Sequence, residues 1–161
     1  MAIIKFEDYV VDKSVYETNL DFENSREDGR LVVPIKFSAE IGVDKTQEKS
    51  YVIINVNLGQ STNPEEIPNI PFTCEVSIRG LYSYSSSDFE NEEELKNVLG
   101  GNAVAILYPY VRTYISTLTN LSNQFPSYTL PVMNFAETIK ENDLITYIGF
   151  DWLFVKKIGI N

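Results

Sequence analysis

Histidine is absent from this chain of 161 residues, and cysteine occurs only once, at Cys74. Without histidine, neither a Ser-His nor a Cys-His pair can activate a nucleophile, and the commonest protein ligand of metals is missing. A single cysteine cannot form an internal disulfide. Because no signal-peptide pattern begins the sequence either, we expect a cytoplasmic protein.

Basic residues are also scarce. The chain has 13 Lys and Arg against 23 Asp and Glu, which gives a net charge of −10. The basic residues are scattered, whereas nucleic acids and anionic membranes bind clusters of them, so neither is an expected partner. No apolar run reaches the roughly 20 residues that a membrane-spanning helix needs.

Recognisable motifs for catalysis and cofactors are missing as well. No glycine-rich phosphate loop follows a strand pattern and no metal-ligand spacing occurs, so we expect no cofactor and no bound metal. Cys74 lies between Phe72 and Val76 in an alternating segment, which favours a small buried hydrophobe over a catalytic nucleophile. These features predict a protein that is not an enzyme.

The chain does have enough hydrophobic residues, 43% of the total, to bury the core of one domain spanning residues 1–161. Residues 31–41, 51–58 and 72–82 place apolar side chains at alternate positions, which is typical of antiparallel strands buried on one face. Residues 2–11 are a further candidate strand, at a sheet edge. Strands first and a long helix later predict an α+β domain with helices on one face of the sheet.

A long helix is expected in the second half of the chain. Apolar residues recur there at steps of three and four, at Leu107, Val111, Tyr114, Leu118 and Leu121. A second flank widens this stripe with Ile106, Tyr110 and Ile115. A helix that is apolar over so wide an arc usually packs against two partners, so we expect both a sheet and a second surface on it.

The helix boundaries are predicted from proline and glycine. Pro109 lacks an amide proton, so we expect regular helix from about Tyr108 and a looser lead-in over residues 100–107. Gly100-Gly101 is expected to end a short acidic helix that Ser87-Asp88 would cap.

The segment after the helix is apolar although it is predicted as a loop. Residues that precede proline favour extended backbone, and Phe125-Pro126 and Leu130-Pro131 bracket this segment, so residues 125–133 should form a stiff loop. Two interpretations remain open. The loop either lies over the core or forms the wall of a groove that accepts extended apolar segments of other chains, a role that methionine and aromatic side chains suit. Residues 135–142 are expected to form a short helix, and residues 143–161 to include a strand.

The spacing of several motifs resembles that of the SecB family of protein-export chaperones. The motifs are Ala105-Ile-Leu-Tyr-Pro-Tyr-Val-Arg112, Phe125-Pro126, Leu130-Pro-Val-Met-Asn-Phe135 and the strand-like run 72–82. The resemblance implies a four-stranded or slightly larger antiparallel sheet, with one long helix and a shorter C-terminal helix on one face. It also implies a homotetramer, arranged as a dimer of dimers, that acts as an ATP-independent holdase for unfolded or nascent client proteins during export.

The same resemblance implies three sets of site residues. Clients would bind in an apolar groove lined by Tyr128, Leu130, Val132, Met133 and Phe135. Subunits would meet through Val111, Tyr114, Leu118 and Leu121 on the helix and through Cys74, Val76 and Ile78 on the strand. An acidic surface with Glu75 and Glu17 would dock a SecA-type motor.

The chain also departs from the family pattern. Residues 143–161 are apolar and include Lys156-Lys157 where the family has an acidic tail, and Thr73 stands where an apolar contact residue is expected. Both differences weaken the expected contact with a motor. The alternative is therefore an adaptor or specific partner-binding protein with the same fold, such as a chaperone associated with a toxin–antitoxin pair, in which residues 143–161 close the groove.

Overall fold

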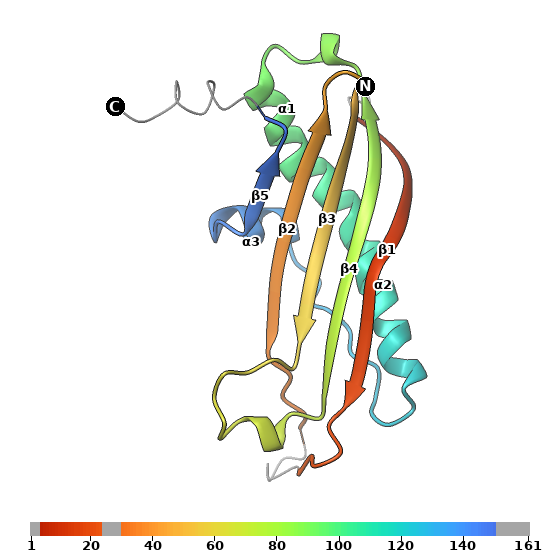
Figure 1. Cartoon of the computed structure of the whole chain (residues 1–161), viewed down its shortest axis with the longest axis vertical. Coiled ribbons are helices and arrows are strands. Elements are labelled where there is room, and N and C mark those ends of the chain that lie inside the picture. The colour runs from red at the N-terminus through yellow and green to blue at the C-terminus, as the bar shows by residue number, and fades with distance from the viewer. Residues whose placement is uncertain (1–3, 24–29, 151–161) are drawn as a thin grey trace, which may run out of the picture.

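The computed structural model describes residues 4–23 and 30–150 (Figure 1). Five strands form one sheet in the order β1-β4-β3-β2-β5. Their bounds are β1 Ile4–Thr18, β2 Ile35–Asp44, β3 Lys49–Leu58, β4 Phe72–Tyr84 and β5 Ile145–Ile148. The expected antiparallel arrangement holds for β1 to β4, whereas β5 runs parallel to its neighbour β2. The strand expected within residues 143–161 is thus present, and residues 151–161 lie outside the described part.

Strand β1 extends beyond the predicted strand over residues 2–11. The prediction was too short because two irregularities interrupt the alternation of the strand. Its pairing with β4 shifts register between Phe6 and Asp8 and again between Val11 and Lys13. Each such β-bulge adds one residue to a strand and reverses which of the following positions face the core. The apolar pattern therefore changes phase twice, and the alternation seen in residues 2–11 does not continue to the true end of the strand.

Helices α1 and α2, joined by a π-helical turn, form one nearly continuous path that crosses one face of the sheet (Figure 1). Helix α1 spans Glu92–Val98, a π-helical turn spans Leu99–Ala103, and helix α2 spans Val104–Leu121. The predicted stop at Gly100-Gly101 and the predicted start near Tyr108 are therefore wrong. The wider π-helical turn carries the glycine pair through without ending the helix. Pro109 lies inside α2 on an exposed side, where water can solvate the carbonyl that its ring leaves unbonded.

Two asparagines begin the short helices. The Asn91 side chain accepts a hydrogen bond from the Glu94 amide, so it caps α1 in place of the expected Ser87-Asp88. Helix α3, Phe135–Glu141, begins in the same way with Asn134 accepting from the Glu137 amide. An N-cap side chain of this kind satisfies an amide that has no partner within the helix. The short helix expected over residues 135–142 is confirmed.

The core lies between the sheet and α2. Strands β3 and β4 contribute fully buried side chains at alternate positions, and α2 covers them with Leu107, Val111 and Ile115. Tyr82 is also buried there, and its hydroxyl donates to the Ala103 carbonyl at 2.7 Å. This bond ties the π-helical turn to the sheet and explains why a polar group tolerates that position.

The helix stripe is rotated from the expected one. The buried residues of α2 are Val104, Leu107, Tyr108, Val111, Ile115 and Thr119. Tyr114 and Leu118 are only half-buried, and Leu121 is 73% exposed. Tyr110 is 40% exposed on the adjoining flank. The middle of the sheet thus covers one part of the wide apolar arc, and β1 covers the rest only in part, through contacts of Phe6 and Tyr9 with Tyr110.

Candidate functional site

The loop between α2 and α3 is held by side chains of α2. The Tyr108 hydroxyl donates to the Pro131 carbonyl at 2.7 Å, and Arg112 Nε donates to the Leu130 carbonyl at 3.0 Å. Thr119 Oγ1 accepts from the Tyr128 amide at 2.8 Å. These bonds satisfy main-chain groups that have no sheet or helix partner, so an apolar loop can lie close to the core in one conformation.

The five residues expected to bind clients divide into two groups. Leu130 is 0% and Phe135 2% exposed, so both belong to the core. Val132 is 86% exposed, and Tyr128 and Met133 are half-buried. The loop therefore covers the core with one set of side chains and presents the other set at the surface. A client could touch Val132 directly, whereas Leu130 and Phe135 are reached only if the loop or α3 moves.

Aromatic rings connect this loop to the sheet. Phe135 stacks on Tyr108 with ring centroids 4.4 Å apart and meets Phe37 of β2 edge-on at 5.0 Å. Phe125 packs against Phe72 at 6.2 Å, which places the start of the loop on the inner side of β4. Phe37, Phe125, Tyr128 and Met133 are all partly exposed while they pack on the core. Rings held in this way offer apolar area at low entropy cost.

The expected interface residues of β4 lie inside the subunit. Cys74, Val76 and Ile78 are at most 2% exposed, and Val111 on α2 is 0% exposed. They form the core beneath α2, so a second subunit could not touch them without opening the fold. Burial also raises the pKa of the Cys74 thiol to about 11, which keeps it protonated and unreactive at neutral pH.

An uncovered aromatic surface lies instead between α2 and β1. Tyr9 and Tyr110 are about equally exposed, at 41% and 40%, with ring centroids 5.0 Å apart. They line a shallow cavity of about 380 Å³ together with Pro109, Thr113, Tyr114 and Thr117. The Tyr114 hydroxyl donates to Ser14 Oγ at 2.8 Å and fixes this side of the helix on β1. The sequence did not identify Tyr9 as part of this surface, because the first bulge of β1 interrupts the alternation just before it. Tyr110 was already included in the predicted apolar flank of the helix.

The expected motor-docking residues lie on the open face of the sheet. Glu75 accepts a bond from Lys13 Nζ at 2.7 Å, and Arg79 Nη2 lies 3.1 Å from Asp12 Oδ1. Glu17 is exposed near the end of β1, opposite Thr73 of β4. Glu75 and Asp12 are therefore each paired with a cation, and the surface around Glu75 is not a simple acidic patch.

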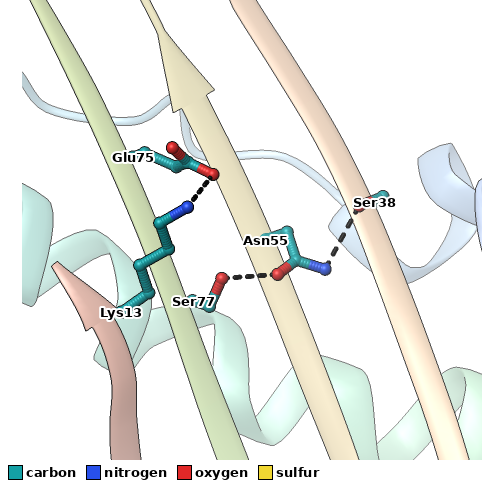
Figure 2. A network of polar contacts seen from close by, with 5 residues as sticks. All are labelled: Lys13, Ser38, Asn55, Glu75 and Ser77. Carbon is teal, nitrogen blue, oxygen red and sulfur yellow. Dashed lines mark hydrogen bonds and ion pairs between the residues drawn. The ribbon is translucent and has the colours of Figure 1, made fainter. Parts of the chain in front are cut away.

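A polar row continues across the same face (Figure 2). Ser77 Oγ donates to Asn55 Oδ1 at 2.6 Å, and Asn55 Nδ2 donates to Ser38 Oγ at 3.3 Å. Lys13, Ser77, Asn55 and Ser38 are consecutive neighbours in the register of β1, β4, β3 and β2. These bonds between neighbouring strands satisfy the polar side chains of Ser77 and Asn55, which are only partly exposed on this face.

Two further observations concern residues 4–23 and 30–150. None of their helices is long and apolar enough to span a membrane. They also bring together no group of three or more His, Cys, Asp or Glu side chains that could hold a metal ion.

Comparison with known proteins identifies the family. The family model described as preprotein translocase subunit SecB matches residues 7–143, which is most of the chain. The protein therefore belongs to the SecB family.

Several curated relatives support this assignment. The protein-export protein SecB of Ehrlichia ruminantium is 27% identical, over 85% of this chain and 90% of the relative. That of Buchnera aphidicola is 32% identical over 67% and 66% of the two chains. An uncharacterized protein of Methanocaldococcus jannaschii is 26% identical, over 87% of this chain and 88% of that protein.

A solved structure shares the fold. It is the Mycobacterium tuberculosis SecB-like chaperone Rv1957 in complex with a ChAD peptide from the antitoxin HigA1, with a TM-score of 0.63. The two chains are 22% identical, and the match covers 81% of this chain and 90% of the other. The SecB-like α+β fold expected from the sequence is thereby confirmed, with a parallel fifth strand in addition.

Proposed function

We propose that this SecB-family protein is an ATP-independent holdase chaperone of the cytoplasm, without enzymatic activity. Its clients would be unfolded or nascent proteins, bound through the apolar surface beside the loop between α2 and α3. The observation that carries the proposal is the family match over residues 7–143, combined with a loop that α2 fixes in place while Val132 remains 86% exposed.

The mechanism follows from the chemistry of this surface. The exposed and half-buried loop side chains Tyr128, Val132 and Met133 make apolar contacts that require no particular client sequence. Three hydrogen bonds from α2 hold the loop before a client arrives, so little ordering entropy opposes binding. Several weak sites on one assembly would retain a client by avidity and release it without energy input.

A homotetramer, a dimer of dimers, is part of the proposal. Its support is the uncovered surface of Tyr9 and Tyr110, next to the half-buried Tyr114 and Leu118 and the exposed Leu121. Strand β1 is also an edge of the sheet among the described residues, and long edge strands usually need cover. Val111, Cys74, Val76 and Ile78 would then support the interface from inside the subunit. Light scattering tests this proposal, and a monomer at micromolar concentration would contradict it.

A second candidate is a partner-specific chaperone that does not deliver clients to a SecA-type motor. The observation that favours it is the pairing of Glu75 with Lys13, because a basic motor segment would have to displace Lys13 first. The SecB-like chaperone Rv1957 binds an antitoxin peptide and illustrates such a role. If SecA binds the protein and the affinity falls when Glu17 and Glu75 are changed to glutamine, the export role is supported. If no binding is detected, the partner-specific role is favoured.

The holdase function can be tested with an aggregation assay. Val132→Asp and Met133→Asp add a charge to the proposed client surface, and Thr129→Asp adds the same charge at an exposed polar position of the same loop. We expect the first two variants to suppress client aggregation much less than the wild type and the third to match it. A wild-type protein that neither suppresses aggregation nor binds unfolded peptides would refute the proposal.

A further inference from the structure

Strand β5 follows the part of the chain that the SecB family model matches, which ends at residue 143. It pairs in parallel with β2 over four positions, from Ala39–Ile145 to Gly42–Ile148. The other strand pairs of the sheet are antiparallel and involve many more residues. Because parallel pairing is slightly less stable per residue and this strand is short, β5 is the weakest-held strand of the sheet.

The side chains of β5 alternate between the core and solvent. Ile145 and Tyr147 are half-buried and oppose the buried residues Ala39 and Ile41 in the register. Thr146 and Ile148 are exposed. The inward face therefore presents one aliphatic and one aromatic side chain, two positions apart.

The ring of Tyr147 occupies a shaped position between β2 and the helical path. The Lys96 ammonium lies 4.2 Å from its ring centroid, in cation–π contact. A Cβ atom on Gly100 would come within 3.0 Å of the Tyr147 hydroxyl, so glycine leaves the space for this ring. The Phe150 ring also meets the Tyr147 ring edge-on, with centroids 5.5 Å apart. We call the position between Lys96 and Gly100 the ring slot.

The segment enters and leaves the edge of β2 through turns. Asp143 and Gly149 flank β5, and both have positive φ, of 54° and 85°. On the entry side, the Leu144 carbonyl accepts the Ala39 amide at 3.0 Å. A short edge strand between two turns can open locally without unfolding the sheet.

We propose that the edge of β2 at Ala39–Gly42, together with the ring slot, is a binding site for extended segments that carry an aliphatic and an aromatic residue two positions apart. In this structure Ile145–Ile148 occupies the site in cis. A client segment of the same pattern adds to the β2 edge as a strand when β5 leaves, with main-chain hydrogen bonds providing affinity and the slot providing selectivity. This inference rests on the proposed holdase function and adds to it a second subsite and the segment that closes it.

Occupation in cis also limits how much of the protein can bind at this site. Only the fraction of molecules in which β5 is open can accept a segment, and the apparent affinity falls in proportion to that fraction. The tethered segment competes at high local concentration, whereas a client must bind from solution. Weakening β5 should therefore increase binding at this site.

A labelled peptide tests the site directly. A fluorescent peptide with the sequence of residues 143–150 is added to the full-length chain, and binding is measured by anisotropy. We expect the variant Ile145→Ser/Tyr147→Ala to bind the peptide about ten-fold more tightly than the wild type, because its own segment competes less. The matched control Thr146→Ala/Ile148→Ser changes only the exposed side of the same strand and should bind like the wild type.

The peptide supplies the second control. A peptide in which Tyr147→Ala removes the ring should bind the weakened variant about ten-fold less well, since it cannot fill the slot. If the folded weakened variant binds no peptide, or binds both peptides equally, the inference is overturned. The urea midpoint and circular dichroism of each variant show whether it is folded.

Hydrogen exchange on the wild type covers the case in which the weakened variant does not fold. Local opening of β5 predicts that the Ala39 amide exchanges about 100-fold faster than the core amides of Ile54 and Val76. Exchange of all these amides at one common rate would show that β5 opens only with global unfolding, and would overturn the inference. The aggregation assay separates the two proposals: if the wild type fails there while the peptide results hold, only the holdase function is lost.

Discussion

Leu130→Ala tests whether the loop between α2 and α3 is part of the core. The side chain is 0% exposed, and the substitution removes the equivalent of three methylene groups, worth about 2.4 kcal/mol at about 0.8 kcal/mol each. The cavity that remains adds to this transfer cost, so we expect the free energy of unfolding to fall by about 3–5 kcal/mol. For a chain of this size the melting temperature should fall by roughly 6–20 °C.

The matched control is Val132→Ala, two positions further along the same loop. Val132 is 86% exposed, so the change in the free energy of unfolding should be within about 0.5 kcal/mol. Urea denaturation at one fixed protein concentration measures both variants, because assembly makes stability depend on concentration. If Leu130→Ala and Val132→Ala both cost less than about 1 kcal/mol, the loop is not seated on the core and the reasoning about its two faces fails.

Three further predictions concern other parts of the molecule. Tyr108→Phe removes the bond to the Pro131 carbonyl and should lower the free energy of unfolding by about 0.5–1.5 kcal/mol in the same urea assay. Tyr114→Asp should dissociate the assembly or unfold the subunit, which light scattering and circular dichroism distinguish; an intact oligomer would contradict the interface proposal. Burial raises the pKa of Cys74 to about 11, so its contribution to stability is complete below the pKa of the unfolded thiol and is lost as the pH rises towards 11. In urea titrations at alkaline pH, Cys74→Ala should therefore lose less stability than the wild type as the pH rises towards 11. In the wild type, a thiol reagent at pH 8 should react with Cys74 only after urea is added.

The strands show what a single sequence can predict. Strands β2, β3 and β4 keep one alternating phase along their length, so their core-facing residues were predictable from position alone. Strand β1 changes phase at two bulges, and a window that assumes a constant period cannot follow it. The error at Tyr9 has this origin.

The helical region shows a different limit. Glycine usually ends a helix, but Gly100 is buried next to Tyr147, Ile145 and Ile41, and a Cβ atom there would lie only 3.0 Å from the Tyr147 hydroxyl. Its role is therefore close packing, which depends on a strand 45 residues later in the chain. Local rules for helix ends cannot detect such a partner.

The candidate site was predicted in part from the sequence pattern, and the rest of it depends on contacts between distant segments. The apolar, proline-bracketed character of residues 125–133 was evident from the sequence, but the opposite exposures of Leu130 and Val132 depend on where α2 binds the backbone. Likewise, the acidity of Glu75 was visible, whereas its partner Lys13 lies 62 residues away. Contacts between distant segments decide both questions.

The bonds that fix the loop go to its main chain. Tyr108, Arg112 and Thr119 bind two carbonyls and one amide, atoms that every replacement of the loop side chains except proline retains. The outward-facing position 132 can thus be randomised without loss of the bonds that hold the loop backbone. A library at this site would make the loop an interchangeable surface for selecting new binding preferences on an unaltered scaffold.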